Sequence, residues 1–150
     1  MTLEESARRA AEELAWLKAG AGQAPEQWQA PEQWQAHIRA YVLARFLLED
    51  QGEEDILRLA QQSVSKLTGI PPEQLAKADR PSGCTAATAV LDKKVLLVMS
   101  LCKALEVAIR PEELPELKTV PQLAGLLRER VEEKGEGRKR NAHSGALGMG

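Results

Sequence analysis

The sequence predicts an all-α protein, and two observations carry this prediction. Ala, Leu, Glu, Gln, Lys and Arg dominate, whereas Phe and Tyr occur once each. The first group loses little rotamer freedom in a helix, and the residue types that favour strands are sparse. In addition, apolar residues recur at three- and four-residue steps in segments that Pro and Gly interrupt. The 150 residues suffice for one domain, or for a small domain with an appendage.

The balance of charge argues against several classes of partner. The chain has 20 basic and 22 acidic residues, so its formal net charge is −2. No strong field therefore points to nucleic acid or to a membrane surface. No apolar run approaches the roughly 18 residues of a membrane-spanning helix. Acidic residues precede any apolar stretch at the start of the sequence, which argues against a secretory signal. We therefore expect a cytoplasmic protein.

The first helix is predicted at residues 3–18. Thr2 is a suitable N-cap, and Glu4 and Glu5 fall in the first turn, where the helix dipole favours negative charge. One apolar stripe follows the helical repeat. It consists of Leu3, Ala7, Ala10, Leu14 and Leu17.

The hexapeptide Ala-Pro-Glu-Gln-Trp-Gln then occurs twice in tandem, at residues 24–29 and 30–35. Six residues turn a helix through roughly 600°, so Trp28 and Trp34 would not share a face if both copies were helical. Because Pro followed by Glu favours a helix start, we expect one copy to begin a helix and the other to form a turn or linker. Two interpretations stay open: a two-tryptophan motif that anchors a partner, or a duplication tolerated in a surface loop.

A second helix is predicted at residues 31–50, forming a helical hairpin with the first. His37 has no His, Cys or carboxylate at ligand spacing, so we expect a surface histidine. Residues 1–52 are thus predicted to be an N-terminal helical extension. The inner side of the second helix is traced by Trp34, Ile38, Tyr41, Val42, Arg45 and Leu48.

Residues 53–134 are predicted to form a four-helix bundle. Thr119 is the expected N-cap of the last helix, because Pro121 follows in its first turn, where a missing N–H costs little. Residues 135–150 are rich in Gly and basic residues without an apolar period, which predicts a disordered tail. The expected elements of the bundle are helices at 53–67, 90–105, 111–114 and 120–133, with a loop at 76–89 between the first two.

Four segments in this half of the chain resemble the acyl carrier protein family in order and spacing. The resemblance covers about half of the chain, and it implies the four-helix carrier fold. In chain order the segments are LTGI at 67–70, VLLVM at 95–99, AIRPEE at 108–113 and KTV at 118–120.

The same resemblance implies a phosphopantetheine arm on a serine that opens the second helix of the bundle. In this chain Val90 takes the place of that serine, and a valine has no hydroxyl to carry the arm. Ser82 is the nearest serine, but it lies well before that position and lacks the family's Asp-Ser-Leu context. The family docks on basic partners through an acidic second helix. Here Lys93 and Lys94 reverse that charge, which disfavours the usual partners.

The sequence thus favours a non-catalytic, acyl-carrier-like module without a cofactor, which acts through a protein partner or through self-association. The candidate contact residues are Lys93, Lys94, Trp28 and Trp34. No nucleophile has an adjacent base, and the Cys and His residues lack metal-ligand spacing. Two alternatives remain: a functional acyl or peptidyl carrier with 4′-phosphopantetheine on Ser82, and an unrelated helical adaptor or regulator.

Overall fold

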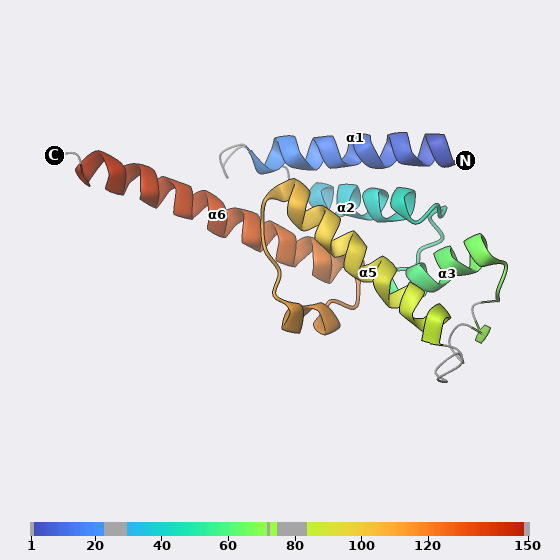
Figure 1. The fold of residues 1–150 in the computed structure, drawn as a ribbon. Helices are drawn as coiled ribbons and strands as arrows, with labels where there is room; N and C mark the ends of the chain where they lie inside the picture. The colour runs from blue at the N-terminus through green and yellow to red at the C-terminus, as the bar shows by residue number, and fades with distance from the viewer. Residues whose placement is uncertain (1, 23–29, 72, 75–83, 149–150) are drawn as a thin grey trace.

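The computed structural model describes residues 2–22, 30–71, 73–74 and 84–148, with the backbone alone for 84–88 and 135–148. This part of the chain folds as a bundle of helices, which confirms the predicted all-α class (Figure 1). The elements are α1 (Leu3–Ala21), α2 (Pro31–Arg45), α3 (Ile56–Thr68), α5 (Cys84–Leu105), the 3₁₀ helix η3 (Pro111–Glu116) and α6 (Val120–Gly148).

The helices α1 and α2 form the predicted hairpin. Thr2 caps α1, because its hydroxyl accepts from the Glu5 N–H while the Glu5 carboxylate accepts from the Thr2 N–H. This reciprocal arrangement satisfies two backbone donors at the helix start. Pro31 is the first residue of α2, so the second copy of the hexapeptide begins the helix as expected. The first copy lies outside the described residues.

The helix α2 is packed on several sides. The consecutive residues Tyr41, Val42, Leu43 and Ala44 are all buried, so the helix has no wholly solvated face at this point. α2 packs against α1 on one side and against α6 on another (Figure 1). The buried residues of the hairpin and of the later helices belong to one hydrophobic cluster. The N-terminal hairpin therefore shares a core with the rest of the bundle.

In the second half of the chain, backbone hydrogen bonds tie the start of α3 to the start of α6. The Ile56 N–H donates to the Lys118 carbonyl at 2.8 Å, and the Val120 N–H donates to the Glu54 carbonyl at 2.9 Å. Nearby, Arg130 of α6 donates to the carboxylate of Glu113 in η3. This guanidinium is the main reason that the pKa of Glu113 falls to about 2. The short helix is thus held against the long one.

Three boundaries differ from the sequence prediction. α2 ends at Arg45 instead of near residue 50, because Leu47 turns the chain at a left-handed φ of 61°. α5 begins at Cys84, inside the predicted loop, since the alanine-rich segment 85–89 suits a helix. α6 continues to Gly148 through most of the predicted disordered tail. A helix already anchored by packing gains one hydrogen bond per added residue, and no proline interrupts it there.

Candidate functional site

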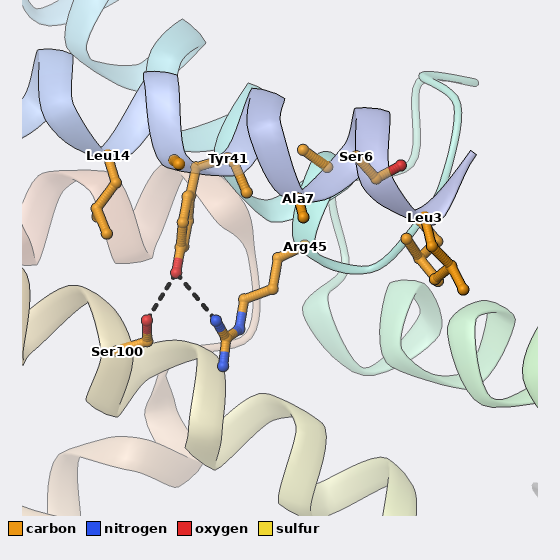
Figure 2. Close-up of a pocket in the computed structure, with 11 residues that line it drawn as sticks. Leu3, Ser6, Ala7, Leu14, Tyr41, Arg45 and Ser100 are labelled. Carbon is orange, nitrogen blue, oxygen red and sulfur yellow. Dashed lines mark hydrogen bonds between the residues drawn. The ribbon is translucent and has the colours of Figure 1, made fainter. Parts of the chain in front are cut away.

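A groove of about 430 Å³ lies between α1, α2 and α5. In Figure 2, α1 runs along one side and Ser100 of α5 lies on the other, with Tyr41 of α2 reaching between them. Three helices that are distant in sequence therefore form one concave surface. The lining residues are Leu3, Ser6, Ala7, Ala10, Ala11, Leu14, Tyr41, Ala44, Arg45, Leu47 and Ser100.

The groove stays open because small side chains face it from α1. Ala7, Ala10 and Ala11 each contribute only a methyl group to the wall. A leucine at such a position fills the space between packed helices, as the fully buried Leu17 does further along the same helix. Leu3, at the open end, leaves 69% of its surface exposed.

A cluster of polar groups crosses the groove. The buried Tyr41 places its hydroxyl 2.7 Å from the Ser100 hydroxyl, and Arg45 Nη1 donates to the same Tyr41 oxygen at 3.3 Å (Figure 2). The Ser6 hydroxyl, in a residue that is 1% exposed, has no hydrogen-bond partner among the described residues. A buried hydroxyl without a partner loses its hydration and gains no compensating bond.

Positive charge collects at the Arg45 side of the groove. The Lys93 ammonium lies 5.5 Å from the centroid of the Phe46 ring, a cation–π contact. Burial lowers the pKa of Lys93, and the nearby charge of Arg45 lowers it further. Among the residues that the structure describes, no carboxylate forms an ion pair with Arg45 or Lys93. Within the described residues, these two positive charges are thus not paired with a carboxylate.

Exposed apolar side chains lie on α5, the helix that contributes Ser100 to the groove. Leu96 and Met99 are 55% and 59% exposed, and they lie three residues apart on one side of the helix. Residues three or four apart are neighbours on a helix surface, so Leu96 also adjoins Ser100. Together with Leu3 across the groove, they give the site an apolar rim.

Two of the predicted contact residues are buried, which corrects their assignment to a partner surface. Trp34 is 5% exposed, and its indole N–H donates to the Ala124 carbonyl at 3.0 Å. The apolar repeat that includes Trp34 places it in the core between α2 and α6. Lys94 is 4% exposed, and burial lowers its pKa. Lys93 is half-buried and remains beside the groove.

The position matched to the carrier serine also differs from expectation. Val90 lies in the second turn of α5, since the helix begins at Cys84, and it is 7% exposed within the hydrophobic cluster. The sequence comparison had placed Val90 at the first position of the helix, and this placement is wrong. Ser82 and Trp28 lie outside the described residues.

The groove residues were only partly visible in the sequence. Tyr41 and Arg45 were both placed on the inner side of their helix, and a charged residue four positions after a tyrosine on an apolar face is the signal that marks them. Ser100 interrupts the apolar run VLLVMSLC in a comparable way. Ser6 gave no signal, because serine is common in the first turns of helices.

Comparisons with known proteins found no significant match to this chain. No protein-family model matches the chain, and neither the curated proteins nor the solved structures include a significant match. Within the described residues, no group of His, Cys, Asp and Glu side chains is arranged to hold a metal ion. None of the helices in that part of the chain is long and apolar enough to span a membrane.

Proposed function

We propose that this protein is a non-catalytic, acyl-carrier-like helical module that acts through protein–protein interaction and carries no phosphopantetheine arm. The observation that carries the proposal is the groove between α1 and α5, with its exposed apolar rim and unneutralised cations. Exposed apolar side chains gathered at a concave surface with a few polar groups are typical of a binding surface.

The absence of an arm is supported by the position of Val90. An arm requires a hydroxyl at an accessible helix start, whereas Val90 is aliphatic and packs into the core. The order α3, α5, η3, α6, with a short element between two long helices, is compatible with a carrier frame. The frame would then serve as a scaffold for the interaction surface.

The arm-free state is tested by intact mass after incubation with a phosphopantetheinyl transferase and coenzyme A. We expect no gain in mass, while an ordinary acyl carrier protein in a parallel reaction gains one arm. A gain of one arm that disappears in Ser82→Ala would contradict the proposal and identify a functional carrier with a displaced site.

The interaction role is tested by photo-crosslinking in the cells that produce the protein. A benzoylphenylalanine at position 99, on the exposed rim, is expected to capture a discrete protein or a second copy of the chain. The control is the same probe at position 12, on the side of α1 that faces away from the groove. Equal or absent crosslinking at both positions would argue against an interaction surface at the groove.

A further inference from the structure

We infer that the groove between α1 and α5 binds an acidic amphipathic helix of a partner protein. This inference rests on the proposed interaction function and specifies the chemistry of the partner. A helix that docks in a groove presents apolar anchors at three- and four-residue spacing, and its flanking polar residues set the specificity.

The exposed apolar side chains beside the groove favour a helix over a small ligand. The groove is bordered by α1 and α5. Leu3 lines it and is largely exposed. The exposed Leu96 lies one helical turn from the groove-lining Ser100, with the exposed Met99 next to Leu96 on the helix surface. A molecule that filled only the groove would leave those side chains in water. A helix about 10 Å wide is broad enough to cover exposed side chains beside the groove as well as the groove itself. The alanines of α1 allow such a helix to approach closely.

The charge of the site selects acidic side chains. Arg45 lines the groove, and Lys93 lies within electrostatic reach of Arg45. Neither has a carboxylate partner among the described residues. The Arg45 guanidinium has several N–H donors and can hold a carboxylate in a two-bond arrangement. The unpartnered Ser6 hydroxyl offers one further donor. A basic segment would meet like charge and be disfavoured.

The charge of the groove also argues against docking of the C-terminal segment of a second copy of this chain. The end of α6 extends away from the other helices (Figure 1). The sequence of residues 135–148 contains Arg138, Lys139 and Arg140 but only one acidic residue, Glu136. This segment of a second copy would therefore bring positive charge to the positive side of the groove. The occupant expected from the charge is a different, acidic chain.

A helical-peptide display library tests the inference, with the full-length protein as bait. Enriched peptides are expected to carry apolar residues at helical spacing with Asp or Glu beside them. The strongest binder is then synthesised with a fluorophore and titrated by anisotropy. Arg45→Glu and Lys93→Glu should each weaken its binding by about tenfold or more. Circular dichroism verifies that both variants stay folded.

The matched control is Arg9→Glu, the same change in charge on α1. Arg9 lines a separate hollow beside Ala36 and Leu43, away from the inferred docking surface, so binding should stay within about twofold of the unchanged protein. A peptide whose acidic residue is replaced by Lys should regain affinity for the Arg45→Glu variant. This reciprocal recovery reports direct pairing, which a purely structural role of Arg45 would not produce.

Several results would overturn the inference. These are enrichment of neutral or basic peptides, an equal loss of binding with Arg9→Glu, or no enriched peptide together with saturable binding of laurate, which would identify a small amphipathic carboxylate as the ligand. Crosslinking at position 99 separates this failure from failure of the proposed function. If crosslinking captures a partner but acidic helical peptides do not bind, the interaction role stands and only the inferred acidic helix is rejected.

Discussion

The two ends of α1 have the same apolar repeat but different surroundings. Toward its C-terminal end, Leu17 is fully buried and Trp16 stacks on the His37 ring, with 3.6 Å between ring centroids. Toward its N-terminal end, alanines face the open groove and Leu3 is largely exposed. The spacing of apolar residues brings both ends toward the bundle, while side-chain size decides whether the space is filled.

α2 also has a filled end and an open end, but here the filled end is the N-terminal one, because α2 runs antiparallel to α1. Near its start, Trp34 fills the space against α6 and satisfies the Ala124 carbonyl. Near its end, Tyr41 and Arg45 present polar groups to the groove. The hairpin thus has a closed end, where large side chains fill the space between helices, and an open end, which borders the groove.

The largest effect is expected from emptying the closed end. Trp34→Ala removes a buried indole and should lower the free energy of unfolding by about 3–5 kcal/mol. Trp34→Phe keeps an aromatic ring but loses the hydrogen bond from the indole N–H to the Ala124 carbonyl, which should cost about 0.5–1.5 kcal/mol. Urea unfolding followed by circular dichroism measures both. A loss below about 1 kcal/mol for Trp34→Ala would mean that this end is not tightly packed.

A matched pair of alanine substitutions compares filled and open space directly. Ala60→Leu places a larger side chain at a fully buried site in α3, which should cost about 1–3 kcal/mol. Ala7→Leu extends into the groove and should change stability by no more than about 0.5 kcal/mol. Thermal unfolding of the two variants gives the difference. Equal destabilisation would show that the groove closes in solution.

A moderate loss of stability is expected at the polar cluster that crosses the groove. Tyr41→Phe removes one hydroxyl from the Tyr41–Ser100 pair and should cost about 1 kcal/mol. Ser100→Ala should cost a similar amount, and the double variant less than the sum of the two, because the pair is lost only once. Denaturant titration of the four proteins measures this coupling. Full additivity would mean that the two hydroxyls contribute independently.

The existence of each long helix could be predicted from the sequence, because apolar periodicity and Pro or Gly boundaries are local signals. The ends were less predictable. The segment 85–89 contains only Thr and Ala, and its alanines favour the helix that the structure shows over the predicted loop. Leu47 ends α2 through a backbone conformation that leucine rarely adopts, and no sequence pattern announces it.

The groove could not be predicted in the same way. The stripe from Leu3 to Leu17 indicated one continuous buried face, but burial depends on what lies opposite each residue. Opposite Ala7 and Ala10 the bundle leaves space, and only the packing of α1 against α2 and α5 determines that. Lys94 was misjudged for a related reason: it lies one helix position from Lys93, and a rotation of roughly 100° moves its side chain into the core.

Leu47 links the shape of this surface to the turn between α2 and α3. A glycine would adopt a φ of 61° with less strain, yet it would remove a side chain that lines the groove. The carbonyl of the same residue accepts from the Lys66 ammonium at 2.6 Å. The bend at Leu47 therefore has two roles, because its side chain forms part of the groove wall and its carbonyl holds Lys66 of α3 next to the end of α2.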